Sequence, residues 1–248
     1  MKKIKKIRNP PLERVVLQLD FSEDFSLNLS KAGEIPNKVA EFYNREPYLV
    51  LLPIIAPGQA IEIPPMGPLR FSDQENKNWL EIGKKHIIFT FKKYIDWPWL
   101  LERILNIIFI LKEILEFKSI DNTFLTYINK FNFQKDGFDF DKFFTVFLKK
   151  PGNWEILPHD IFIGILPIDE DNEKIILRLK SLKDIKKTDE ILQFTSEIVY
   201  LNRGVLIPVK KDKLKIYLTH AHDQIINYFI EFLTQEHHKI LGLEIEDG

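Results

Sequence analysis

Residues 214–232, LKIYLTHAHDQIINYFIEF, predict the clearest helix of the chain. Apolar residues recur there every three or four positions, which is the pattern of a helix with one buried face. They are Leu214, Leu218, Ala221, Ile225, Phe229 and Phe232. We expect this helix to cover residues 212–238, after a break in the chain at Gly204 and Pro208.

The segments before this helix predict several strands and a second long helix. The second helix covers residues 98–117, because Pro98 suits a first helical turn and a mostly apolar stretch follows. Runs rich in branched and aromatic side chains predict strands at 12–21, 69–72, 79–94 with a turn at 83–85, 124–129, 161–168, 174–180 and 191–200. Short helices are expected at 36–44, with Pro36 in the first turn, and at 139–148, with Asp139 as the cap. The proline-rich residues 53–68 predict a loop.

This order of elements predicts an α+β fold with two lobes. Each half of the chain has strands followed by a long helix that packs over them, and the sheets are expected to be mainly antiparallel. The lobes would cover residues 1–150 and 151–248, with a single domain as the alternative.

Composition excludes several classes of protein. The 248 residues carry 35 Lys and Arg against 36 Asp and Glu, so nucleic acid is not bound by overall charge. Without cysteine there is no disulfide scaffold, thiolate zinc site or cysteine nucleophile. The basic start at 1–8 is followed by Asn9-Pro10-Pro11 and predicts no secretory signal, while charges interrupt the apolar segment 97–117. We therefore expect a soluble, cytoplasmic protein.

The histidines of the long helix suggest a metal site that helical geometry does not favour. His220 and His222 lie two residues apart, so they point about 200° away from each other and cannot hold one ion. No phosphate loop or Gly-x-Ser-x-Gly motif occurs, and we predict no catalytic residue, metal or cofactor. A metal-dependent hydrolase or nuclease that uses His222 and Asp223 remains the alternative. His237 and His238 are expected near a helix C-terminus, where cations interact favourably with the helix dipole.

Local basicity is the remaining functional signal. Residues 174–215 contain eleven Lys and Arg against five acids. Lys174, Arg178 and Lys180 are two and four residues apart, so a strand would place them on one face, where they could contact phosphates. The candidate nucleic-acid-binding residues are Lys174, Arg178, Lys180, Lys183, Lys186, Lys187, Arg203, Lys210 and Lys211. A solvated lysine face that keeps the protein soluble is the alternative.

Three short motifs resemble a sporadically distributed prokaryotic family of conserved hypothetical proteins. Residues 9–21, NPPLERVVLQLDF, are similar to the family's Pro-apolar-Glu-x-Val strand at the start. Tyr127-Ile128-Asn129 resembles its Arg-Tyr-x-Asn strand, although Leu125-Thr126 stand where an Arg is frequent, and His222 to Phe232 resembles its C-terminal His…Phe helix.

The resemblance implies an uncharacterised accessory protein of antiviral defence, with no catalytic residues to carry over. One such role is a heterodimer with a defence effector such as a short Argonaute, in which this chain adds a basic surface for guide or target RNA or single-stranded DNA. An antitoxin-like protein that masks a toxin, with residues 53–68 as a candidate surface, is a further alternative.

Overall fold

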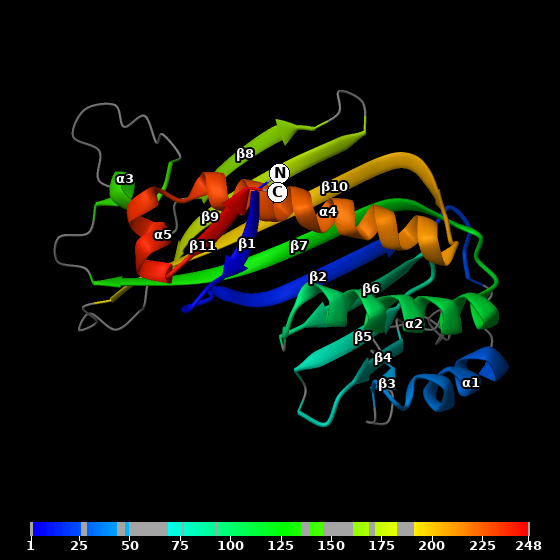
Figure 1. The fold of residues 1–248 in the computed structure, drawn as a ribbon. Coiled ribbons are helices and arrows are strands. Elements are labelled where there is room, and N and C mark those ends of the chain that lie inside the picture. Colours follow the sequence, from blue (N-terminus) through cyan, green and yellow to red (C-terminus); the bar gives the residue numbers. More distant parts are fainter. Residues whose placement is uncertain are drawn as a thin grey trace, which may run out of the picture. The chain divides into compact units, whose positions relative to one another are not determined.

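The computed structural model of the chain describes residues 2–25, 29–43, 48–49, 69–75, 77–92, 94–134, 139–145, 161–168, 172–182 and 191–247. Helices and mostly antiparallel strands alternate along it (Figure 1), which confirms the predicted α+β class. Two compact units are formed: unit 1 contains residues 1–15, 125–202 and 219–248, and unit 2 contains residues 16–124 and 203–218. The boundary predicted near residue 150 lies outside the described residues and stays a prediction.

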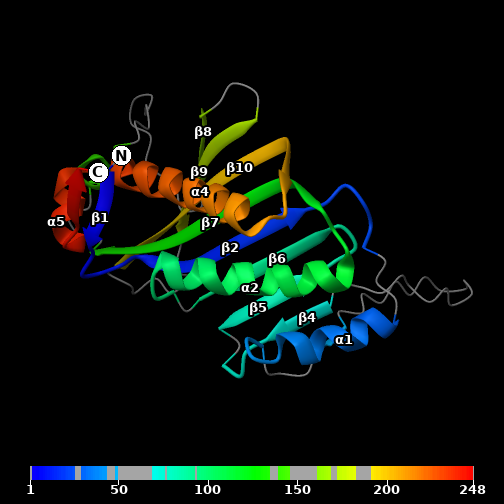
Figure 2. The same cartoon turned by 45° about the vertical axis from the view of Figure 1, so that its right-hand side comes forward.

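Unit 2 is a sheet with helices on one face. Its strands are β3 (Tyr48–Leu49), β4 (Leu69–Ser72), β5 (Asn78–Ile82) and β6 (His86–Phe91), followed in the sheet by the ends of β2 (Leu12–Asp20) and β7 (Ser119–Gln134). Its helices are α1 (Leu29–Val39) and α2 (Trp97–Leu115). Helix α2 lies across β5 and β6 in both views (Figures 1 and 2).

The core of unit 2 explains why α2 forms where the sequence predicted it. Asp96 caps the helix by accepting the Trp99 backbone N–H at 2.8 Å. Leu100 and Ile104 of α2 are fully buried, as are Leu17 and Phe89 of the strands. Each such side chain contributes about 1.5–3 kcal/mol by leaving water, so the apolar faces of helix and sheet hold each other in place.

Unit 1 combines strands of the large sheet with helices and with both ends of the described chain. The sheet order is β2, β7, β10 (Ile191–Pro208), β9 (Glu173–Leu182) and β8 (Ile161–Pro167). The helices are α3 (Phe140–Phe143), α5 (Gln235–Leu241) and, from Thr219 onwards, α4 (Lys211–Phe232), whose first residues belong to unit 2. Strands β1 (Lys2–Lys6) and β11 (Glu244–Asp247) pair antiparallel and bring the two termini together (Figure 1). The basic start is therefore a strand, which the sequence did not predict.

Helix α4 confirms the predicted buried stripe but ends earlier than expected. All six stripe residues from Leu214 to Phe232 are buried. The helix stops at Phe232 because Leu233 forms a β-bridge with Phe144, supported by a hydrogen bond from the Thr234 N–H to the Phe143 carbonyl at 3.1 Å. Thr234 then caps α5, so the single helix predicted over 212–238 is wrong.

Three other boundaries also differ from the predictions. Helix α1 begins before Pro36 and ends at Val39, because the buried pair Ile35 and Val39 sets its position. Gly204 does not end β10: it takes a φ of 77°, which glycine tolerates, and the strand continues to Pro208. The helix after Asp139 is α3, of four residues, and residues 146–148 of its prediction lie outside the described chain. Among the described residues, no helix is long and apolar enough to cross a bilayer.

Candidate nucleic-acid interface

Strand β9 carries cations on one face and core residues on the other. Ile175 and Leu179 are buried, with 1% and 3% of their surface exposed. Lys174 is half-buried, and Arg178 and Lys180 are exposed. Since side chains alternate across a strand, the three cations share the face opposite the core, as the sequence predicted.

The neighbouring strand β10 supplies an acid beside this cationic face. The antiparallel register places Glu197 opposite Arg178, and Arg178 Nη1 lies 3.4 Å from Glu197 Oε2. Both side chains are well exposed, so this ion pair contributes at most about 1 kcal/mol and can exchange its partner. The register also places Thr195, an uncharged residue, opposite Lys180. We name Lys174, Arg178 and Lys180 the β9 cationic row.

The other predicted cations either lie outside the described residues or belong to unit 2. Lys183, Lys186 and Lys187 lie outside the described residues. Arg203, Lys210 and Lys211 are exposed and belong to unit 2. There the Arg203 guanidinium lies 5.8 Å from the centre of the Phe124 ring, and Lys211 Nζ lies 4.0 Å from Glu102 Oε1. The β9 cationic row is therefore the predicted site that the structure describes within unit 1.

The two histidines of α4 bind different strands. His220 Nε2 lies 3.2 Å from Glu173 Oε2 of β9. The other oxygen of that carboxylate accepts a hydrogen bond from the Asn202 side chain of β10, also at 3.2 Å. On the other side of the helix, His222 Nδ1 is 2.7 Å from the Tyr127 hydroxyl of β7.

These contacts confirm that His220 and His222 do not converge on one ion. Burial lowers the pKa of His222 to about 3, so the imidazole is neutral at pH 7. Asp223, the next residue, is half-buried. Within the described parts of the chain, no three His, Asp or Glu side chains gather closely enough to hold a metal ion. His222 acts as a hydrogen-bonded packing residue between α4 and the sheet.

His237 has a role that differs from the prediction. Its ring lies in a cluster of aromatic side chains, 5.0 Å from the Phe131 ring centre, and its Nδ1 is 3.1 Å from the Phe143 carbonyl oxygen. Burial lowers its pKa to about 4. Because α5 starts at Gln235, His237 lies in a first helical turn and is neutral, so the predicted interaction of a cation with a helix C-terminus is wrong here.

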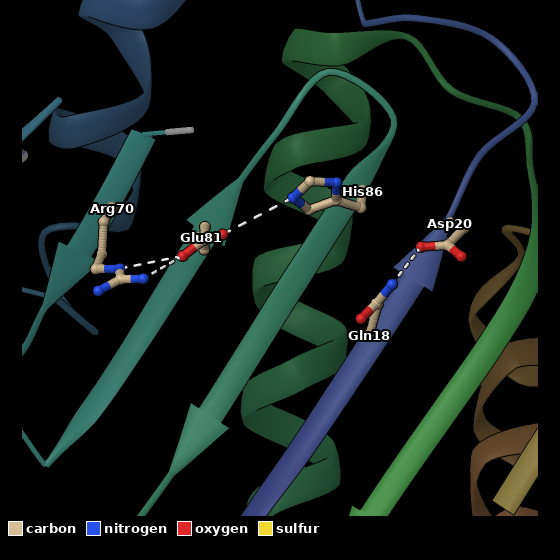
Figure 3. A network of polar contacts seen from close by, with 5 residues as sticks. All are labelled: Gln18, Asp20, Arg70, Glu81 and His86. Carbon is tan, nitrogen blue, oxygen red and sulfur yellow. Dashed lines mark hydrogen bonds and ion pairs between the residues drawn. The ribbon is translucent and has the colours of Figure 1, made fainter. Parts of the chain in front are cut away.

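Unit 2 contains a polar row that the sequence analysis did not identify. Arg70 Nη2 is 2.6 Å from Glu81 Oε2, and His86 Nε2 is 3.8 Å from Glu81 Oε1. Figure 3 shows these side chains with Gln18 and Asp20 on the face of β4, β5, β6 and β2 that points away from α2. The Gln18 amide donates to Asp20 Oδ1 at 2.8 Å. The polar residues at alternate positions of the predicted strands indicate a polar face of the sheet. Which of them contact each other depends on how the strands pair, and the sequence pattern does not predict that pairing.

No protein-family model and no curated protein matches the chain.

The two buried imidazoles make stability depend on pH. Their folded pKa values of about 3 and about 4 lie below the ordinary 6.5, so protons bind the unfolded chain better. The stability is complete above pH 6.5 and is lost as the pH falls. Chemical denaturation between pH 6.5 and 5, above the range where carboxylates titrate, should show a loss of up to about 1.4 kcal/mol per pH unit for each imidazole.

Single variants show how much each histidine contributes to the change of the unfolding free energy with pH. His222→Gln and His237→Gln should each lower the slope by about half, because each removes one of the two imidazoles whose pKa is lowered in the folded chain. A wild-type free energy of unfolding that stays constant from pH 6.5 to 5 would contradict the burial of the two neutral rings.

Proposed function

We propose that this protein is a non-catalytic accessory subunit of a prokaryotic antiviral defence system. It binds the sugar-phosphate backbone of a guide or target strand through the β9 cationic row. It forms a heterodimer with an effector such as a short Argonaute. The observation that carries the binding proposal is the position of Lys174, Arg178 and Lys180 on one strand face, with Ile176 between the first two.

The chemistry of the row favours backbone binding without base specificity. Lysine and arginine ammonium and guanidinium groups bind phosphate oxygens, whereas sequence is read through contacts to base edges. The row lies on a regular strand whose other face is fixed in the core by Ile175 and Leu179. The cations are therefore held on a rigid support, with Lys174 and Arg178 four residues apart and Arg178 and Lys180 two residues apart, which lowers the ordering cost of binding.

The assignment to defence is supported by the resemblance of the three sequence motifs. The alternative hydrolase reading would use His222 with Asp223. The hydrogen bond of His222 to Tyr127 and the lowered pKa give that imidazole a structural explanation. The alternative surface at residues 53–68 lies outside the described chain.

Salt dependence tests the binding proposal. Affinity for a fluorescent single-stranded oligonucleotide should fall with salt, with a slope on logarithmic axes of about −0.7 for each phosphate contact. Replacing Lys174, Arg178 and Lys180 together with glutamine should therefore make the slope shallower by about 2. A matched variant with glutamine at Lys38, Lys84 and Lys118, three exposed lysines of unit 2, should keep most of the wild-type slope.

An affinity that does not respond to salt, or an equal loss in both triple variants, would refute binding by the β9 cationic row. Thermal unfolding of both variants separates lost binding from lost folding.

Recovery from native cells tests the heterodimer. A tagged copy of the protein, purified and treated with nuclease, should retain a defence effector in stoichiometric amount, because the contact is between proteins. Recovery of this chain with no effector, before and after nuclease, would contradict the accessory role.

A further inference from the structure

Strand β8 is the last strand of the sheet in unit 1. It pairs with β9 on one side, from Ile161 opposite Lys180 to Pro167 opposite Lys174, without a shift in register. No other strand of the described chain adjoins its second side. Within the described chain, the seven residues of β8 therefore pair on one side only, and their remaining backbone donors and acceptors form a regular row.

The sequence of β8 carries little of the usual protection of an edge strand, with Pro167 at its end as the exception. Residues 161–167 read IFIGILP and contain no charged side chain. Soluble proteins normally protect exposed edges with lysines, bulges or very short strands. The described strand order of unit 2 ends in β3, which has two residues and so follows that rule. The length and apolar sequence of β8 instead favour pairing with another strand.

The hydrogen bonds of the β8–β9 turn identify which backbone groups face outwards. The Ile168 N–H bonds the Glu173 carbonyl at 2.9 Å, so residue 168 faces β9. Since this direction alternates along an antiparallel strand, the N–H and C=O groups of Ile161, Ile163 and Ile165 face away from β9. Pro167 also faces away and offers a carbonyl without an N–H.

We propose that β8 pairs antiparallel with the β8 of a second copy of this chain, around a two-fold axis at Gly164. In this register Ile163 lies opposite Ile165 of the second copy, and Ile161 lies opposite Pro167, whose carbonyl accepts the Ile161 N–H. The pairing gives about six hydrogen bonds between the copies. A second copy fits because it supplies a strand of the same length and without charge, whereas a charged partner strand finds no opposite charge on β8.

The symmetry of this contact extends the proposed binding surface. A two-fold axis between antiparallel strands is perpendicular to the sheet, so both copies present the β9 cationic row on the same face. The rows are three strand spacings apart, about 14 Å. The consequence for binding rests on the proposed function: a nucleic-acid strand long enough to contact the rows of both copies is bound more tightly than one that contacts a single row.

Sedimentation velocity over a range of concentrations tests the dimer. Wild type should sediment with twice the chain mass of 29.4 kDa. Ile165→Pro removes an N–H that faces outwards and should give a folded monomer, whereas Leu166→Pro removes an N–H that faces β9 and should unfold more readily. Wild type that stays monomeric, or an Ile165→Pro variant that is folded and still dimeric, would overturn the proposal.

A second pair of variants keeps the test decisive if proline prevents folding. Ile163→Lys adds like charges across the two-fold axis and should give a monomer, while Thr195→Lys adds the same charge on β10 and should remain dimeric. Equal masses for these two variants would contradict pairing through β8.

Nucleic-acid binding by the monomeric Ile165→Pro variant, which carries no added charge, separates the two proposals. We expect the monomer to bind a short oligonucleotide with the wild-type salt response per chain, and a long one about tenfold or more weakly than the dimer. Dimerisation without any oligonucleotide binding would refute the proposed function and leave the β8 contact standing. Oligonucleotide binding by a wild-type protein that is monomeric would refute the β8 contact and leave the proposed function standing.

Discussion

The alternation of side chains along β9 connects the core of unit 1 with its charged surface. Ile175 and Leu179 are nearly inaccessible to water, and their burial fixes which way the intervening positions point. A slip of one residue would bury Arg178 and expose both core residues, so the register is strongly specified. The cationic row is thus a consequence of the same packing that stabilises the sheet.

Polar contacts attach α4 to this sheet and account for its two histidines. His220 shares the Glu173 carboxylate with Asn202, while His222 contacts Tyr127. Tyr127 is buried, and a buried polar group costs about 1–3 kcal/mol when its partner is removed, so its contact with His222 specifies how the helix lies on the strands. The histidines that resemble a metal-binding motif in the sequence therefore have structural roles. The charged face of β9 is the surface for which we propose phosphate binding.

Local patterns predicted the elements, and long-range pairing set their limits. The stripe in α4 and the alternation in β9 repeat with the periods of a helix and a strand, so the sequence was sufficient to orient them. The break between α4 and α5 depends on a β-bridge between Leu233 and Phe144. These residues are far apart in the sequence, so no local pattern predicts their contact. Likewise, the sequence located Arg178, but its contact with Glu197 follows from the register of two strands.

That contact also provides the most direct test of the central claim, because it allows a gain in binding that misfolding cannot imitate. Glu197→Gln removes the acid beside Arg178 and adds no cation. If the β9 cationic row binds phosphates, oligonucleotide affinity should rise by up to about fivefold, because Arg178 no longer has to give up an ion pair worth at most about 1 kcal/mol. Unchanged or weaker binding by a variant with wild-type stability would contradict the account.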